Sequence, residues 1–379
     1  MYNYDNQLNA VSLFSGCGGL SLGFIDAGFN VVLSIDNDEK ALEAYRYNVK
    51  SSHVINSDLG DKDTLKKART LLRDTRVDAV IGGPPCQGFS LTGPRKLEDE
   101  RNVLYRAYVD FIEAFKPRAL LIENVPGLAT LYGGRVKNDI ILTFENLGYR
   151  MYMQVLNAAE YGIPQFRKRL FFVGIKKGLD DFSFPLPTHS EAGGLSVWGH
   201  ILKQYVTCED AIGDLPSLEG EHWEEETEYT EHPKTEYQKK MRGNCNVLYN
   251  HVRTNHKEHV VKVISLVPEG GNYKDLPEGV GESRKFNEAW TRYHSKKPSK
   301  TIDTGHRNHF HYKYNRVPTI RENARLQSFP DYFVFTGSKT SQNRQVGNAV
   351  PPLLAKHIAL KINKTLSTGE IEDEIKQKV

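Results

Sequence analysis

Gly82-Gly83-Pro84-Pro85-Cys86-Gln87 follows a short apolar run, residues 77–81, and ends it abruptly. The run predicts a buried strand, and two glycines and two prolines then stop regular structure. The sequence thereby places one thiol, Cys86, on a loop at the carboxyl end of a strand, where ligands bind in open α/β sheets. A lone cysteine of this kind is more often buried beside a turn, so the interpretation depends on the surrounding motifs.

The composition is that of an ordinary globular chain. Its 379 residues are enough for two or three domains, and 39% of them are hydrophobic and 26% charged. No apolar run approaches the roughly 18 to 20 residues that a membrane span needs, and residues 1–7 lack the features of a signal peptide. The four cysteines lie far apart without a CxxC pair. We therefore expect no disulfide framework, no metal site, no membrane contact and a reducing, cytoplasmic setting.

Charge is distributed unevenly, although the formal net charge is only +3. Residues 209–236 carry eleven acidic residues against one base, and residues 284–316 carry nine Lys or Arg against two acidic residues. Binding of a polyanion is therefore expected to centre on the second window. A solvated surface with local charge clusters would give the same counts.

Strand and helix patterns alternate in the first third of the chain. The expected strands are residues 10–14, 31–35, 77–81 and 119–123, and the expected helices are residues 20–27, 39–48, 62–73 and 104–115. Such alternation predicts a mostly parallel α/β sheet with helices on both faces. Residues 185–318 lack clear periodicity and predict a separate, less regular domain. Helical patterns return at 321–327 and 353–366, and a polar tail, 367–379, is expected to fray.

A glycine-rich turn, Phe14 to Gly19, lies between the first strand and the first helix. Glycine lets a ligand approach the backbone closely, and Asp36 follows Gly16 by the spacing of dinucleotide folds, where an acid binds ribose hydroxyls. The turn reads GxGG and not GxGxxG, so a nucleoside without phosphates fits better than a dinucleotide. Asp58 lies where an adenine amino group could bind. Helix N-capping is the alternative role for both acids.

The ordered set of motifs resembles the DNA cytosine-5 methyltransferases that use S-adenosylmethionine. The motifs are FSGCGG (14–19), GGPPCQGFS (82–90), ENV (123–125), QFRKR (165–169), RENARLQSFPD (321–331) and QVGNAVPP (345–352). Residues 185–318 match only in position, where the family keeps its variable target-recognition domain. The resemblance implies a discontinuous Rossmann-like catalytic domain, 1–184 and 319–366, around the target-recognition domain.

The resemblance also implies the catalytic residues. A Cys86 thiolate would add to carbon 6 of cytosine, which activates carbon 5 toward a methyl sulfonium. Glu123 would hold the base at N3 and its amino group, and Asn124 would order the loop around Pro84. Arg167 and Arg169, two residues apart on one face of a strand, would contact the cytosine and its phosphate and lower the pKa of the thiol. A surface ion-pair face is the alternative for the two arginines.

Contacts with the cofactor and with double-stranded DNA follow from the same resemblance. The expected cofactor contacts are Phe14, Gly16, Gly18, Gly19, Asp36, Asn37, Asp58, Pro84, Asn348 and Val350. A target base must be flipped out of the duplex, and the loop 87–101 has the composition of a lid that closes over DNA. The expected DNA contacts are Gln87, Ser90, Arg101, Lys300, Thr301, Ile302, Arg307 and Asn308, with phosphate binding or solvation as the alternative for each side chain.

Three other functions are open to a chain with these motifs. A tRNA methyltransferase of the same superfamily is disfavoured by the long basic region, and a silent DNA-binding regulator by the intact set Cys86, Glu123, Arg167 and Arg169. A dehydrogenase is disfavoured by the missing GxGxxG. The leading hypothesis is a bacterial or phage restriction–modification methyltransferase, monomeric by default and located in the cytoplasm or nucleoid. A cognate restriction endonuclease could act on the same site, with no direct contact implied.

Overall fold

The computed structural model describes residues 7–85, 103–218, 224–280, 290–305 and 308–377, with side chains to residue 368. It divides into two compact units, and each is described by itself. The first comprises Met1–Leu156, Lys168–Leu186 and Leu354–Val379, and the second comprises Asn157–Arg167 and Pro187–Leu353.

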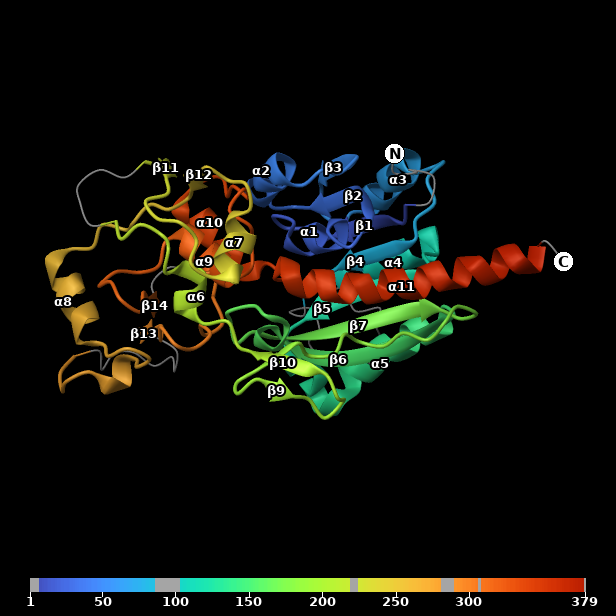
Figure 1. Ribbon diagram of the computed structural model, residues 1–379. Coiled ribbons are helices and arrows are strands. Elements are labelled where there is room, and N and C mark those ends of the chain that lie inside the picture. Colours follow the sequence, from blue (N-terminus) through green and yellow to red (C-terminus); the bar gives the residue numbers. More distant parts are fainter. Residues whose placement is uncertain (1–6, 86–102, 219–223, 281–289, 306–307, 378–379) are drawn as a thin grey trace. The chain divides into compact units, whose positions relative to one another are not determined.

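The first unit is built on a seven-stranded sheet with the order β3-β2-β1-β4-β5-β7-β6 (Figure 1). Its strands are β1 (Asn9–Leu13), β2 (Asn30–Asp36), β3 (His53–Asn56), β4 (Ala79–Gly82), β5 (Ala119–Asn124), β6 (Tyr149–Asn157) and β7 (Lys168–Lys176). β1 to β5 pair in parallel, and β7 runs antiparallel to β5. The prediction of a mostly parallel α/β sheet is confirmed, because the alternating sequence supplies the crossover helices that parallel neighbours need.

Helices cover both faces of this sheet. They are α1 (Gly19–Ile25), α2 (Glu39–Asn48), α3 (Lys62–Leu71), α4 (Val103–Phe115), α5 (Arg135–Asn146) and α11 (Pro352–Gln377), with short 3-10 turns at Pro126–Ala129 and Leu131–Gly134. On one face, the Phe144 ring of α5 packs edge-on against Tyr105 and Tyr108 of α4. Leu33 and Ile35 of β2 belong to the same apolar cluster. Ser34 itself points to the opposite face, because side chains alternate along a strand, and bonds Tyr45 of α2 there.

The C-terminal helix α11 belongs to the first unit from Leu354 onward. Asn363 Nδ2 donates to the carbonyl of Ala27, 336 residues away in sequence, at 3.0 Å. Arg118, just before β5, donates to the carbonyl of Leu366 at 2.6 Å. The helix continues to Gln377, past the residue where the tail was expected to fray. Its last residues include several Glu, Lys and Ile, which are compatible with a continued helix.

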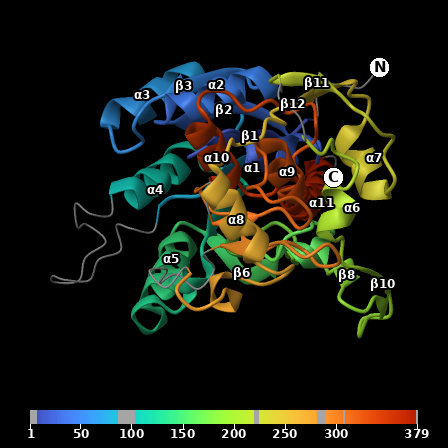
Figure 2. The ribbon, with the colours of Figure 1, turned by 90° about the vertical axis from the view of Figure 1, so that its left-hand side faces the viewer.

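The second unit consists of short elements joined by irregular chain. Its small sheets are β8 (His189–Ser190), β10 (Ile201–Gln204) and β9 (Gly194–Leu195); β11 (Glu226–Glu228) and β12 (Val247–Tyr249), side by side in Figures 1 and 2; and β13 (Thr291–Arg292) and β14 (His309–Phe310). Its helices are α6 (Cys208–Ile212), α7 (Glu236–Arg242), α8 (Glu258–Leu266), α9 (Ile320–Leu326) and α10 (Lys339–Asn348), with 3-10 turns at Ala158–Tyr161 and Tyr273–Asp275.

The two units do not have the bounds of the domains predicted from the sequence. The predicted second part of the catalytic domain, 319–366, is divided: α9 and α10 pack within the second unit, and α11 from Leu354 belongs to the first. The predicted bounds describe functional domains, and as such they stay a prediction.

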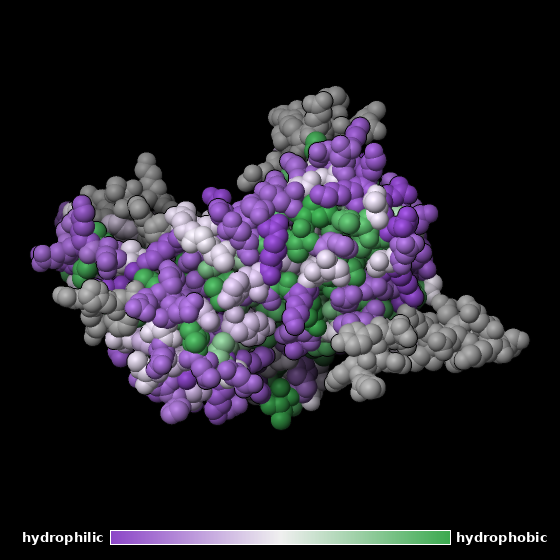
Figure 3. Space-filling view, turned by 90° about the horizontal axis from the view of Figure 1, so that it is seen from above, coloured by the Kyte–Doolittle hydropathy of each residue, from purple (hydrophilic) through white to green (hydrophobic). Residues whose placement is uncertain are grey.

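No helix in the described part of the chain is both long and apolar enough to cross a membrane. The face shown in Figure 3 is mostly hydrophilic, with apolar residues visible between polar ones. The apolar residues in this view gather to the right of its centre, with polar residues around them.

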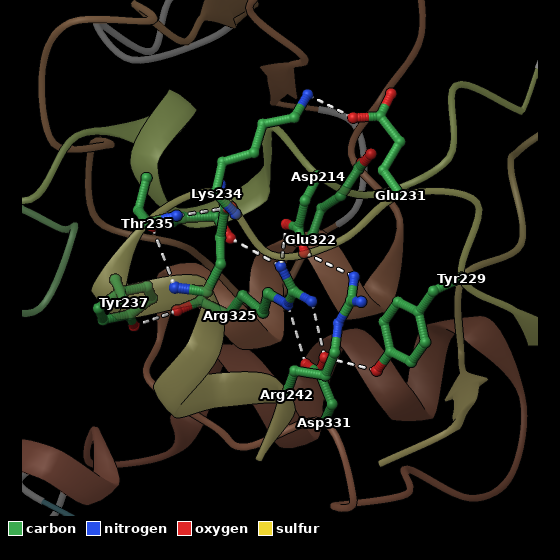
Figure 4. Close-up of polar contacts among 12 residues, drawn as sticks. Asp214, Tyr229, Glu231, Lys234, Thr235, Tyr237, Arg242, Glu322, Arg325 and Asp331 are labelled. Atoms are coloured by element: carbon green, nitrogen blue, oxygen red, sulfur yellow. Dashed lines mark hydrogen bonds and ion pairs between the residues drawn. The ribbon is translucent and has the colours of Figure 1, made fainter. Parts of the chain in front are cut away.

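A buried ion-pair cluster joins α6, α7 and α9 within the second unit (Figure 4). Arg325 of α9 donates to both carboxylate oxygens of Asp331, at 2.9 and 2.7 Å, and also pairs with Asp214. Arg242 of α7 bonds the second oxygen of Asp214 at 2.9 Å and lies 3.7 Å over the ring of Tyr229. Burial alone would raise the pKa of Asp331, but Arg325 holds it below its usual value. The paired charges allow these carboxylates to be buried.

Two buried histidines lie near α9 in the same unit. The Nδ1 atom of His311 accepts backbone N–H groups of Lys313 and Tyr314 at 3.0 and 3.2 Å. His251 contacts the Thr319 hydroxyl through Nδ1 and the Pro216 carbonyl through Nε2, both at 2.9 Å. Burial lowers the pKa of His311 to about 3 and that of His251 to about 4. Both rings are therefore neutral at physiological pH.

Replacing Arg325 is expected to destabilise the second unit. Arg325→Met would leave Asp214 and Asp331 buried with one partner fewer, a loss of about 3–5 kcal/mol in similar cases. All three tryptophans, at positions 198, 223 and 290, belong to this unit, so urea unfolding followed by tryptophan fluorescence reports it selectively. Arg73→Met is the matched control, because Arg73 pairs with Asp74 on an exposed surface. If Arg325→Met and Arg73→Met were equally stable, Arg325 would not stabilise the second unit as expected.

Stability of the second unit is expected to fall as the pH is lowered through about 6.5. The unfolded chain protonates its histidines near this pH, whereas the folded chain keeps His251 and His311 neutral until much lower pH, so protons favour unfolding. From about pH 7.5 to about pH 5.5 the loss is about 1.4 kcal/mol for each histidine. The same fluorescence assay measures it. His251→Asn should flatten the dependence, and exposed His259→Asn should not; an identical slope in all three proteins would refute the explanation.

Candidate active site

The glycine-rich turn between β1 and α1 has a conformation that its glycines permit. Gly16 and Gly18 have φ angles of 51° and 101°, which favour glycine. A Cβ on Gly18 would lie 2.7 Å from Val49 and 2.9 Å from the ring of Tyr45, so packing also requires glycine there. A Cβ on Gly16 would have nothing within 4 Å among the described residues. The turn is therefore closed on the side of Gly18 and open at Gly16, as a cofactor cradle requires.

Asp36, at the end of β2, faces this turn. Its carboxylate accepts the N–H of Gly16 at 2.8 Å and that of Asp38 at 2.9 Å. Burial raises its pKa, which these backbone donors oppose. The helix-capping role considered for Asp36 belongs instead to Asp38, which accepts the N–H groups of Lys40 and Ala41 at the start of α2. Asp36 thus remains at the open turn, as a sugar-binding carboxylate requires.

The other expected cofactor residues of the first unit lie near the same strand ends. Asn37 is exposed, and Phe14 and Gly19 flank the turn, Gly19 as the first residue of α1. Asp58 accepts the N–H of Gly60 at 2.8 Å after β3, and the cap of α3 is Asp61. The capping alternative therefore fails for Asp58 as well.

The start of the loop after β4 is positioned by contacts with the neighbouring strands β1 and β5. A Cβ on Gly82 would lie 2.5 Å from the carbonyl oxygen of Leu13, so only glycine fits between β1 and β4. Asn124, at the end of β5, donates from Nδ2 to the carbonyl of Pro84 at 3.0 Å and accepts the N–H of Val125 at 2.9 Å. Cys86, Gln87, Ser90, Arg101 and Arg307 lie outside the described residues.

Glu123 and Arg169 form a largely buried ion pair beside the start of this loop. The Nε of Arg169 lies 2.9 Å from Glu123 Oε1, and the two side chains are only 15% and 14% exposed. Burial lowers the pKa of Arg169, and the Glu123 carboxylate opposes the shift. A Cβ on Gly83 would lie 3.1 Å from the other oxygen, Oε2. The carboxylate therefore sits against Gly83, three residues before Cys86 in the sequence.

Arg167 has a different environment from Arg169. It precedes β7, which begins at Lys168, and tight turns link Ile163 to Gln165 and Gln165 to Arg167. Arg167 therefore lies just outside the strand that carries Arg169, and the expectation that the two share one face of a strand stays a prediction. Its buried guanidinium donates to the carbonyls of Ile302, at 3.2 Å, and Gly347, at 2.8 Å.

The remaining predicted residues belong to the second unit. Lys300, Thr301 and Asn348 are exposed, and Ile302 and Val350 are buried. Asn308, another expected DNA contact, has its side-chain amide bonded to Asp303, which also accepts the N–H of Gly305 at 2.9 Å.

Two residues of the quoted motifs, Gln165 and Gln327, received no role from the sequence. Both are fully buried and hydrogen-bonded to each other. Their place inside QFRKR and RENARLQSFPD was the only signal, since nothing in a single sequence reveals which polar side chains are buried.

Comparisons with known proteins agree with this geometry. The sequence model of the family described as C-5 cytosine-specific DNA methylase matches residues 8–364. The type II methyltransferase M1.HphI of Haemophilus parahaemolyticus is 39% identical over 377 residues, covering 97% of this chain and 89% of that protein. M.DdeI of Desulfomicrobium norvegicum is 36% identical over 378 residues, covering 94% and 88%.

A solved structure also matches. It is described as a DNA modification methyltransferase encoded within an E. coli prophage, and it is 29% identical, with a TM-score of 0.75 over 95% of this chain and 100% of that one. The family match, residues 8–364, spans nearly the whole sequence and includes the glycine turn, the loop after β4 and the Glu123–Arg169 pair. The chain therefore belongs to the C-5 cytosine-specific DNA methylases.

Proposed function

We propose that this DNA cytosine-5 methyltransferase moves a methyl group from S-adenosylmethionine to carbon 5 of a flipped-out cytosine in a short, specific DNA sequence. The observation that carries the proposal is the Glu123–Arg169 pair against Gly83, at the root of the loop that carries Cys86. Together with Cys86, which follows Gly83 by three residues in the sequence, this carboxylate and this guanidinium supply the groups that the reaction uses. The similar proteins are named as type II methyltransferases, which favours a restriction–modification system.

The cofactor site would be the open turn at the end of β1. Phe14, Gly16, Gly18 and Gly19 would form the cradle, with Asp36 at the ribose hydroxyls and Asn37, Asp58 and Pro84 nearby. Asn348 and Val350 keep their predicted cofactor contacts as part of the proposal. Bound there, S-adenosylmethionine supplies an electrophilic methyl group.

The chemical steps are assigned to this chain's own residues. The Cys86 thiolate adds to carbon 6, which makes carbon 5 nucleophilic toward the methyl group. We assign Glu123 to accept from the exocyclic amino group and, as a protonated carboxyl group, to share its proton with N3 as the thiolate adds. After methyl transfer, a base removes the carbon 5 proton and the thiolate leaves, which restores the aromatic ring.

DNA recognition is assigned to the exposed residues Lys300 and Thr301, with buried Ile302 shaping the turn beneath them. Gln87, Ser90, Arg101, Arg307 and Asn308 keep their predicted DNA contacts as part of the proposal. Arg167 keeps its predicted place near the base, and its two carbonyl bonds favour a supporting role there. A cytoplasmic or nucleoid location, action as a monomer and a nuclease acting on the same site are further parts of the proposal.

Methylation mapping tests the reaction directly. DNA from a methylase-free host that expresses this chain should carry 5-methylcytosine in one short, fixed context, and DNA from a Cys86→Ala host should carry none, because the covalent step is lost. Unmodified DNA from a folded, cofactor-binding wild-type protein would overturn the proposal and favour an RNA substrate or a silent regulator.

Glu123→Gln is expected to lower kcat by about 10²–10⁴-fold, the usual contribution of a positioned acid–base group. Cofactor affinity should change little, since Glu123 would contact the base and not the cofactor. Single-turnover methylation of the mapped sequence and cofactor titration measure the two effects. Glu113→Gln, at an exposed position of α4, is the control. A wild-type rate in Glu123→Gln would remove Glu123 from the mechanism.

A further inference from the structure

Two chain segments of the second unit, 164–167 and 299–302, are bound along their backbones. The N–H of Phe166 donates to the carbonyl of Ser299 at 2.8 Å, and the N–H of Ser299 donates to the carbonyl of Pro164 at 2.9 Å. The Thr301 hydroxyl donates to the carbonyl of Phe166 at 2.7 Å. The exposed turn at Thr301 is therefore held by the QFRKR segment.

Side chains of the same segment bind both backbone polar groups of Ile302. The N–H of Ile302 donates to Gln165 Oε1 at 3.1 Å, and its carbonyl accepts from Arg167 Nη1 at 3.2 Å. Neither group has a strand partner, because Ile302 lies outside the small sheets of this unit. The two side chains thus replace a sheet ladder at the predicted recognition turn.

The same side chains also reach the turn at the end of α10. Arg167 Nη2 donates to the carbonyl of Gly347 at 2.8 Å. Gln165 Nε2 donates to Gln327 Oε1, and Gln327 Nε2 donates to the carbonyl of Ala349 at 2.6 Å. The carbonyls on the two sides of Asn348 therefore accept from Arg167 and from Gln327. Arg167 bonds Ile302 directly, and Gln327 is linked to Ile302 through Gln165.

The two turns are also in direct backbone contact. A Cβ on Gly347 would lie 2.3 Å from the carbonyl oxygen of Asp303, so only glycine allows this approach. Gln165 and Gln327 are fully buried, so each lost bond leaves a buried polar group without its partner, which is destabilising. A buried hydrogen-bond network of this kind favours a specific arrangement of the groups that it joins.

We propose that Gln165 and Gln327, together with Arg167, are positioning residues that hold the recognition turn at Thr301–Ile302 and the turn at Asn348 in one arrangement. The inference rests on the proposed function, in which Thr301 faces DNA and Asn348 faces the cofactor. Ordering of either turn by its ligand then orders the other. Binding of target DNA and binding of cofactor are coupled through these amides, and the coupling is reciprocal.

The test compares cofactor affinity with and without target DNA. S-adenosylhomocysteine, the demethylated cofactor, is titrated into the full chain alone and into its complex with a duplex carrying the mapped sequence. Gln327→Met keeps the side-chain length and removes the bonds to Gln165 and Ala349. The ratio of the two affinities should fall at least about fivefold toward unity in this variant. Gln238→Met is the matched control, because Gln238 is an equally buried glutamine that caps α7 away from this network.

Each outcome bears on the proposal. An unchanged ratio in Gln327→Met, or a wild-type ratio of one, overturns it while leaving the proposed function intact, provided that the wild type methylates the duplex. A wild type that neither binds the cofactor nor methylates DNA means that the proposed function itself has failed. If tryptophan fluorescence shows that Gln327→Met is unfolded, Gln165→Met replaces it, with the same expected loss. A loss of equal size in Gln238→Met would show a general effect of destabilisation and would also overturn the proposal.

Discussion

Buried guanidinium groups make the irregular second unit possible. Its short elements leave many backbone carbonyls without a ladder partner, and a buried carbonyl without a donor is destabilising. Arg292 donates to the carbonyls of Ile264 and Val267 at 2.6 and 2.7 Å. Arg321 donates to the carbonyls of Tyr249, Pro330 and Phe333 at 2.9, 3.0 and 2.6 Å. Five fixed N–H donors on one planar group suit arginine, and not lysine, to this task.

The two units therefore hold their functional residues by different means. In the first, the ends of β1, β2 and β5 are fixed by sheet register and by an apolar core. In the second, the turns at Thr301 and Asn348 depend on bonds from single side chains such as Arg167. Strand register depends on many hydrogen bonds together. Removal of one buried donor, by contrast, leaves its acceptor buried without a partner, at the full desolvation penalty of that acceptor. Single substitutions are therefore expected to do more harm in the second unit.

The sequence predicted the elements that depend on local pattern. The expected helix at 39–48 has the bounds of α2, and the glycine turn and the loop after β4 lie at strand ends as expected. α10, Lys339–Asn348, was missed because its buried residues include Gln342, Asn343 and Gln345, so no apolar stripe marks it. The hydrogen-bond partners of Arg167 could not be predicted from a local sequence pattern either, since they are Ile302 and Gly347, which are distant in sequence.

The end of β5 shows how one strand sets two parts of the site. Successive side chains of a strand point in opposite directions, so Glu123 and Asn124 serve different neighbours. Glu123 lies against Arg169 and Gly83, and Asn124 binds the carbonyl of Pro84. Residues 83 and 84 of the loop are thus both located from two consecutive residues of β5. The start of the loop, at residues 83 and 84, and the position of the Glu123 carboxylate are then fixed together, and a shift of this strand end would displace both.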